Sequence, residues 1–175
     1  AEAFGVTPDI MNVAKQITNG AVPMGAVIAS PEIFDTFMHA GGPQHAIEFS
    51  HGYTYSAHPV ACAAGLAALE LFEREDFPAQ VSAIAPVFEQ KLHALKGRHH
   101  IVDIRNYGLA GALQLAPRNG DPTIRPRDAH MALWEAGFYV RYGGDTLQFG
   151  PPFGTTEAEL ERLFDAVATT LDSLA

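Results

Sequence analysis

Lys15 is the side chain best placed for covalent chemistry. The chain has three lysines, and Lys91 and Lys96 lie on the polar face of an expected helix, near its end. Lys15 instead follows an apolar run at 10–14 and precedes a glycine turn at 18–20. A lysine at the mouth of a buried strand loses hydration, which favours the neutral, nucleophilic amine that Schiff-base chemistry requires. On spacing alone the commoner alternative stays open, namely a lysine that extends from a strand end to water.

The histidines are a second set of residues with possible chemistry, because histidine is a common metal ligand. Four of them fall in a loop-rich stretch and two form a pair: His39, His45, His51, His58 and His99-His100. A zinc site usually shows tight spacing such as His-Glu-x-x-His, and this spacing is absent from the sequence. We therefore expect hydrogen-bonding or solvent-facing histidines and no metal site.

A cluster of hydroxyl groups precedes an expected helix at 57–75. Tyr53, Thr54, Tyr55 and Ser56 follow Gly52. Hydroxyl and backbone N–H groups at a helix N-terminus bind phosphate well. The alternative is ordinary capping of the helix by Ser56.

Arg141 is flanked by Tyr139 and Tyr142 at the end of an expected strand. Arginine binds carboxylates with two parallel hydrogen bonds, so this position suits recognition of an acidic substrate. A surface ion pair is the alternative, and the residues alone favour it.

The elements that must position these side chains can be predicted from periodicity and turn signals. Val22–Ala29 is nearly all apolar, which is typical of a strand buried on both faces. Thr156 with Glu159 predicts a capping box at the start of the last helix. The expected strands are 10–14, 22–29, 101–105, 112–115, 138–142 and 146–149, and the expected helices are 31–39, 57–75, about 78–96, 128–136 and 156–174.

The order of these elements predicts two domains in an α/β protein. Residues 1–75 read as the C-terminal part of a large α/β domain, since two strands need a further sheet to join. Residues 76–175 read as a small α+β domain. The sequence opens without an initiator methionine, and we expect the natural chain to be longer.

Composition excludes several classes of protein. Of the 175 residues 47% are apolar and 18% charged, which is typical of a globular domain. The formal net charge of −9 is diffuse and argues against a nucleic-acid partner. The sequence has no apolar run of membrane-spanning length, and its one cysteine, Cys62, favours a reducing cytoplasmic location.

The sequence as a whole resembles the class III (ω-type) aminotransferases. The resemblance covers nearly the entire chain, and its nearest subgroup is the ω-amino acid (β-alanine)–pyruvate aminotransferases. The motifs that carry it are Phe4–Ile10, Ala14–Ala26, His51–Ala64, Asp103-Ile104-Arg105, Gly108–Gly111 and Val140–Pro152, with the ending at 162–167.

The resemblance implies fold type I of the pyridoxal 5'-phosphate enzymes, assembled as a homodimer or tetramer. It implies that Lys15 holds the cofactor as a Schiff base and transfers a proton. It implies that Thr54, with Tyr53 beside it, reaches the cofactor phosphate of the neighbouring subunit, and that Arg141 binds the substrate carboxylate. Val22 and Pro23 would lie along the loop near the active site.

The sequence departs from the family pattern in two ways. Gln16 stands where most members have a glycine. In the family, the phosphate loop, the aromatic residue that stacks on the cofactor and the aspartate that pairs with the pyridine nitrogen all precede this stretch. We therefore expect activity only together with an N-terminal part of the same enzyme.

The implied reaction is ping-pong transfer of an amino group from an ω-amino acid or amine, such as β-alanine, to pyruvate. Three alternatives remain open. The first is another class III enzyme, such as an aminomutase or a different aminotransferase. The others are a non-catalytic fragment that packs against a partner chain and a metal-binding module built on the loop histidines.

Overall fold

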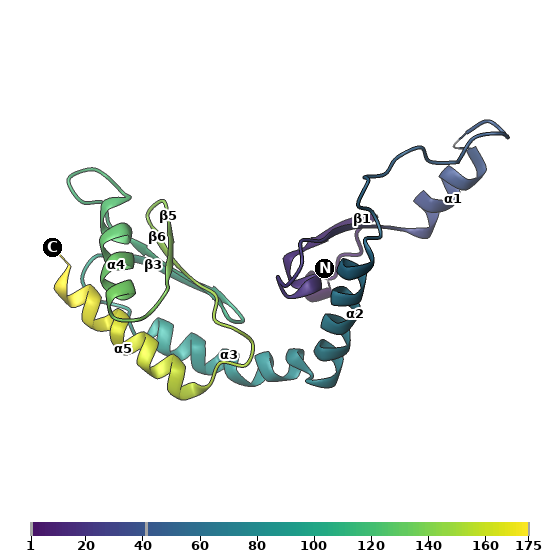
Figure 1. The fold of residues 1–175 in the computed structure, drawn as a ribbon. Helices are drawn as coiled ribbons and strands as arrows, with labels where there is room; N and C mark the ends of the chain where they lie inside the picture. The colour runs from purple at the N-terminus through teal and green to yellow at the C-terminus, as the bar shows by residue number, and fades with distance from the viewer. Residues whose placement is uncertain (1, 41, 175) are drawn as a thin grey trace. The chain divides into compact units, whose positions relative to one another are not determined.

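The computed structural model describes residues 2–40 and 42–174. The chain divides into two compact units, Ala1–Glu75 and Asp76–Ala175, and each is described by itself (Figure 1). The α/β fold class expected from the sequence is confirmed.

A two-stranded antiparallel sheet organises the first unit. Strand β1 (Ile10–Ala14) pairs with β2 (Gly25–Ala29), so that Ile10 lies opposite Ala29 and Ala14 opposite Gly25. A short 3-10 helix, η1 (Glu2–Phe4), precedes the sheet, and a second one, η2 (Lys15–Thr18), follows β1 directly. Asn19, with φ 50°, ends η2 in the left-handed conformation.

Strand β2 differs from its prediction in two ways. It begins at Gly25 rather than Val22, because Pro23 has no N–H to donate and the carbonyl of Val22 accepts a 2.6 Å hydrogen bond from the Thr18 hydroxyl. The prediction that this strand is buried on both faces is also wrong for this chain. Val27 and Ile28 are 69% and 51% exposed, since the strand has a single paired neighbour here.

Two helices complete the first unit. Helix α1 (Pro31–Ala40) follows Ser30 as predicted, and α2 (Pro59–Arg74) begins two residues later than predicted. Pro59 occupies the first turn of α2, where its missing N–H costs nothing. Gly65 of α2 packs against the segment 17–24: a Cβ there would make ordinary contacts of 3.5 Å with the carbonyl oxygen of Ile17 and the sulfur of Met24.

A four-stranded antiparallel sheet forms the second unit. Its strands are β3 (Ile101–Tyr107), β4 (Ala110–Leu115), β5 (Arg141–Gly143) and β6 (Thr146–Phe149), in the order β3-β4-β6-β5. The helices α3 (Phe77–His93), α4 (Ile124–Glu135) and α5 (Glu157–Ser173) pack beside it (Figure 1).

One face of this sheet holds the core. Leu113 and Leu147 lie opposite each other on β4 and β6, and both are fully buried. Leu115, Phe149 and Gly111 share their face, and a Cβ on Gly111 would lie 2.8 Å from atoms of Phe88 and Leu92 on α3. Because side chains alternate along a strand, Gln114, Gln148 and Arg141 lie on the other face of the sheet.

Several boundaries in this unit differ from their predictions. Strand β3 ends at Tyr107 rather than 105, and β4 begins at Ala110 rather than 112. Helix α3 ends at His93 rather than about Lys96, because the backbone tightens to i→i−3 bonds before Gly97. Helix α4 begins at Ile124 rather than 128, since Pro126 is tolerated in a first turn. Strand β5 begins at Arg141 rather than 138, because the Val140 carbonyl accepts a hydrogen bond from His130. The capping box of Thr156 with Glu159 on α5 is confirmed.

Candidate cofactor and substrate sites

Lys15 occupies a strained position at the end of β1. It is the first residue of η2 and has φ 58°, a left-handed conformation that is uncommon for residues other than glycine. The carbonyl of Lys15 accepts the N–H of Gly20. The buried Thr18 hydroxyl donates to the carbonyl of Val22 and so holds the end of the same turn. The side chain is exposed, and within the described residues no carboxylate pairs with it. Strain of this kind is found most often at functional sites.

A cavity lies next to this turn. Gly25, which lies opposite Ala14 in the sheet, is one of its lining residues. Tyr53, Tyr55 and Ser56 supply hydroxyl groups, and Cys62 lies in the wall. His58 adds an imidazole, and the rest of the lining is apolar or small: Val22, Pro23, Met24, Ala26, Ala57 and Ala61.

The hydroxyl-rich segment forms a turn before α2. Ser56 donates its N–H to the carbonyl of Tyr53 at 2.9 Å, and its hydroxyl accepts the N–H of Tyr53 at 3.1 Å. Capping of α2 by Ser56 is therefore wrong, because His58 is the N-cap residue and its side chain makes no cap bond. Thr54 is exposed within this turn.

Arg141 lies on the edge strand β5 of the second unit. It faces Gln148 of β6 across the hairpin, on the side of the sheet away from the core. The side chain is exposed and, in the part of the chain that the structure describes, has no ion pair or hydrogen bond. The surface ion pair considered from sequence is therefore not formed among the described residues.

The structure brings Tyr53, Val22 and Pro23 to one cavity beside the Lys15 turn. Lys15 and Thr54 do not themselves line this cavity, and Arg141 belongs to the other unit. Sequence reasoning missed the left-handed conformation of Lys15 and the polar contacts of the β5–β6 turn. The Gly143-Gly144-Asp145 sequence was the available signal for that turn.

The loop histidines are engaged in other contacts. His39 bonds the carbonyl of Asp35 through Nδ1 at 2.7 Å, and His51 lies between the rings of Phe49 and Tyr53. Across residues 2–40 and 42–174, no three His, Cys, Asp or Glu side chains gather as a metal-binding group.

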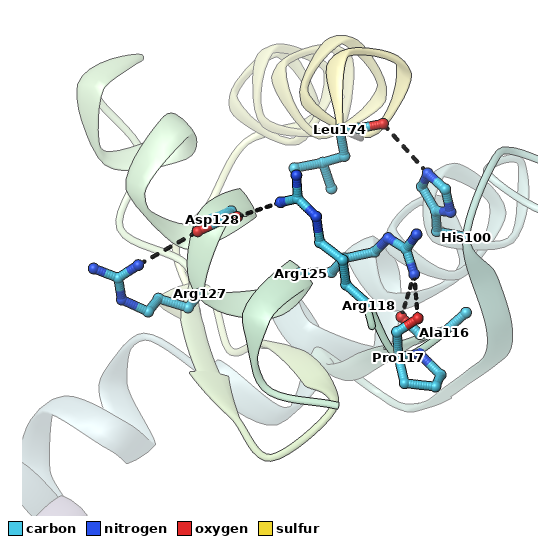
Figure 2. A network of polar contacts seen from close by, with 8 residues as sticks. All are labelled: His100, Ala116, Pro117, Arg118, Arg125, Arg127, Asp128 and Leu174. Atoms are coloured by element: carbon cyan, nitrogen blue, oxygen red, sulfur yellow. Dashed lines mark hydrogen bonds and ion pairs between the residues drawn. The ribbon is translucent and has the colours of Figure 1, made fainter. Parts of the chain in front are cut away.

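A network of charged groups braces the second unit (Figure 2). Arg118 pairs with Asp128 at 2.9 Å, and Arg127 approaches the other oxygen of Asp128 at 3.4 Å. Arg125 donates to the carbonyl oxygens of Ala116 and Pro117 at 2.8 and 2.6 Å. These arginines thus hold the 116–123 loop against α4.

Three carboxylates have pKa values below their ordinary range. Hydrogen bonds from the side chain and then the backbone of Thr123 lower the pKa of Asp121. The Thr146 hydroxyl and then the Gln114 amide lower the pKa of Asp145. The backbone N–H and then the hydroxyl of Thr156 lower the pKa of Glu159. None of these three is a predicted site residue, so their roles are structural or concern positioning.

Among the described residues, no helix combines the length and apolar character that a bilayer crossing requires.

Comparison with known proteins decides the family. Residues 1–171 match the family described as Aminotransferase class-III. The chain belongs to this family. Two curated relatives are similar to this chain over nearly its whole length. A β-alanine–pyruvate aminotransferase of Pseudomonas aeruginosa is 66% identical over 175 residues, and an ω-amino acid–pyruvate aminotransferase of Pseudomonas putida is 63% identical over 174.

The chain spans 39% of the length of each of these two relatives, while they cover 100% and 99% of it. Solved structures of class III transaminases share its fold. An amine transaminase from an uncultivated Pseudomonas species, in its PLP-bound form, matches with a TM-score of 0.88 and 34% identity over 97% of this chain and 39% of its own. An (S)-enantioselective ω-transaminase from Thermomicrobium roseum matches with a TM-score of 0.87 and 32% identity over 97% and 38%.

Proposed function

We propose that this class-III aminotransferase chain is part of an enzyme that transfers an amino group from an ω-amino acid or amine, such as β-alanine, to pyruvate. The names of its 66% and 63% identical relatives support the substrate pair. The observation that carries a chemical role for this chain is Lys15, which is unpaired among the described residues and strained at φ 58° beside a partly apolar cavity. Since the chain spans 39% of those relatives, activity requires the remainder of the enzyme.

The residues around Lys15 fit pyridoxal 5'-phosphate. The cofactor needs a primary amine free to bond its aldehyde, a wall for its ring and hydroxyl or N–H donors for its phosphate. Lys15 would supply the amine and Val22–Ala26 an apolar wall, while the hydroxyl groups of the turn at Tyr53–Ser56 would serve the phosphate of a cofactor held by a neighbouring subunit. When bound, the cofactor would supply the electron sink for the reaction.

Lys15 acts in two ways in this proposal. Its Nζ would hold the cofactor covalently in the resting enzyme. During amino transfer the same Nζ would accept a proton from the amino-bearing carbon of the substrate and then give it up, as general base and then general acid. The strained backbone favours this role because it fixes the direction in which the side chain leaves the sheet.

Tyr53 and Thr54 are proposed to bind the cofactor phosphate of a neighbouring subunit. Both side chains are exposed, and Tyr53 is 78% accessible, as a group that serves another chain would be before assembly. The proposed assembly is therefore a homodimer, or a tetramer built from dimers. Residues 1–75 would be the end of the large domain and 76–175 the small domain, working in the cytoplasm.

Arg141 is proposed to bind the substrate carboxylate and to move aside for a substrate without one. Its guanidinium has no partner among the described residues, so its hydrogen-bonding groups are available for a planar anion. An edge strand of three residues leaves it accessible from the face opposite the core.

The test is turnover by the full-length enzyme with β-alanine and pyruvate, with alanine as the measured product. Lys15→Ala should abolish turnover, and near-normal activity of that variant would end the proposal. Borohydride reduction followed by peptide mapping should leave a cofactor-sized mass on the peptide that contains Lys15. Rearranged β-alanine without pyruvate consumption would instead indicate an aminomutase, and an unmodified Lys15 in an inactive full-length enzyme would indicate a non-catalytic role.

A further inference from the structure

The hairpin that carries Arg141 has few attachments of its own. Strand β5 has three residues and pairs with β6 as its one neighbour in the sheet. The loop between the two strands has two residues, Gly144 and Asp145, with φ 58° at Gly144. Glycine with positive φ at the first loop position is typical of a type II′ turn. The position of Arg141 therefore depends on how this turn is held.

The side chain of Asp145 ties the turn to the next strand. One carboxylate oxygen accepts the Gln114 side-chain amide from β4 at 2.7 Å, and the other accepts the Thr146 hydroxyl at 2.8 Å. The carbonyl of Asp145 also accepts the N–H of Leu115 at 2.8 Å. The bonds from Gln114 and Leu115 join the turn to β4, and the bond from Thr146 holds the Asp145 carboxylate within the hairpin.

The other end of β5 is held by α4. His130 bonds the carbonyl of Val140, the residue before Arg141, at 2.7 Å, and its ring lies 5.1 Å from that of Tyr142. Arg141 thus lies between Val140, whose carbonyl is held by His130, and the turn at Asp145. Its own side chain, in contrast, has no partner in the described part of the chain.

We propose that the Gln114–Asp145 hydrogen bond is a positioning device for Arg141 that tunes selectivity for substrates with a carboxylate. The proposal rests on the proposed role of Arg141. Asp145 and Gln114 touch no substrate themselves. They fix the backbone of β5 before the substrate binds. Because the strand that carries the unpaired guanidinium is already ordered, binding of a carboxylate costs less entropy.

The experiment exchanges the two partners in the full-length enzyme. Gln114→Glu places two carboxylates together and should open the turn, while the double variant Gln114→Glu with Asp145→Asn restores an amide–carboxylate pair in the reverse direction. The readouts are the KM for pyruvate, the KM for propanal, which lacks a carboxylate, and the binding of propionate measured by calorimetry.

We expect Gln114→Glu to raise the KM for pyruvate and the Kd for propionate about fivefold to tenfold, the usual scale of the net contribution of one hydrogen bond. The KM for propanal should stay within about twofold, and the double variant should return all values to near wild type. Equal changes for pyruvate and propanal, no change at all, or a double variant that restores nothing would each overturn the proposal. Should Gln114→Glu not fold, Gln114→Ala removes the bond without a new charge.

The calorimetric arm separates this proposal from the proposed function. If the wild-type enzyme binds propionate but transfers no amino group, the function fails and the positioning device is still tested. If the wild type is active and the Gln114 variants bind propionate normally, the positioning device fails and the function stands.

Discussion

The side chain of Gln148 lies across Gly143 on the exposed face of the β5–β6 hairpin. A Cβ on Gly143 would lie 2.8 Å from the Nε2 atom of Gln148, and Gln148 also lies opposite Arg141 in the strand register. The amide of Gln148 and the guanidinium of Arg141 therefore share one face of a two-stranded segment. The absence of a side chain at Gly143 is what gives the amide this place.

Gly143→Ala should move Gln148 at little cost in stability. The contact is with the far end of a flexible, exposed side chain, so we expect a loss below about 0.5 kcal/mol, as for most surface changes. The matched control is Gly144→Ala next to it. No atom lies within 4 Å of a Cβ there, but φ is 58°, so the strain should cost about 1 kcal/mol. Urea denaturation of both variants compares them, and a larger loss for Gly143→Ala would contradict this account.

Gly111→Ala should be much more harmful than either. A Cβ at this position would lie 2.8 Å from Cζ of Phe88 and from Cδ2 of Leu92, two side chains with no exposed surface. A packed core has no room for the methyl group, so we expect a loss of about 1–3 kcal/mol. Thermal denaturation measures it. Phe88→Leu in the same chain should recover part of the loss, and a neutral Gly111→Ala would show that α3 shifts freely on the sheet.

Glu159 should make the stability of the second unit depend on acid. The backbone N–H and then the hydroxyl of Thr156 lower the pKa of Glu159 in the folded chain. A lowered pKa stabilises the fold above the ordinary value of 4.5, and this contribution is lost as the pH falls through the lower, folded value. Thr156→Ala removes the hydroxyl and keeps the backbone N–H, so it should flatten part of the acid limb of a stability profile measured between about pH 3 and 7.

Thr156→Ala should also lower the stability of the fold at neutral pH. Loss of the capping box removes the Thr156 hydroxyl from the N–H of Glu159, which is typically worth about 1 kcal/mol. Glu157→Gln is the control, because it removes a charge from the same first turn and leaves the box intact. An unchanged acid limb in Thr156→Ala would show that the box has no part in the pH dependence.

Much of the fold could be predicted from sequence because local signals decide it. The capping residues Thr156 and Glu159 defined the last helix, and apolar alternation defined the pair β3 and β4. Errors arose where specific side-chain contacts override such signals. His130 takes the carbonyl of Val140, ten residues away, out of β5. Thr18 takes the carbonyl of Val22, four residues away, out of β2 through a bond that strand periodicity does not register.

The candidate site was predictable in part for the same reason. Residue type and spacing singled out Lys15 and Arg141, whose assigned roles remain predictions. The backbone strain at Lys15 has no local signature, because lysine does not favour positive φ. The contact of Gln114 with Asp145 joins positions 31 residues apart, which depends on the strand order of the sheet.

The strain at Lys15 predicts a conflict between stability and function. At φ 58° a lysine or alanine pays the left-handed penalty, whereas glycine does not. Lys15→Ala and Lys15→Gly both remove the amine and should both be inactive. Without bound cofactor, Lys15→Gly should be the more stable by about 0.5–1 kcal/mol, the relief of strain minus the extra freedom of the unfolded glycine chain. Urea denaturation of the two cofactor-free full-length variants measures the difference. A Lys15→Ala variant at least as stable as Lys15→Gly would mean that the position is unstrained, and the backbone argument for Lys15 as the reactive lysine would then fail.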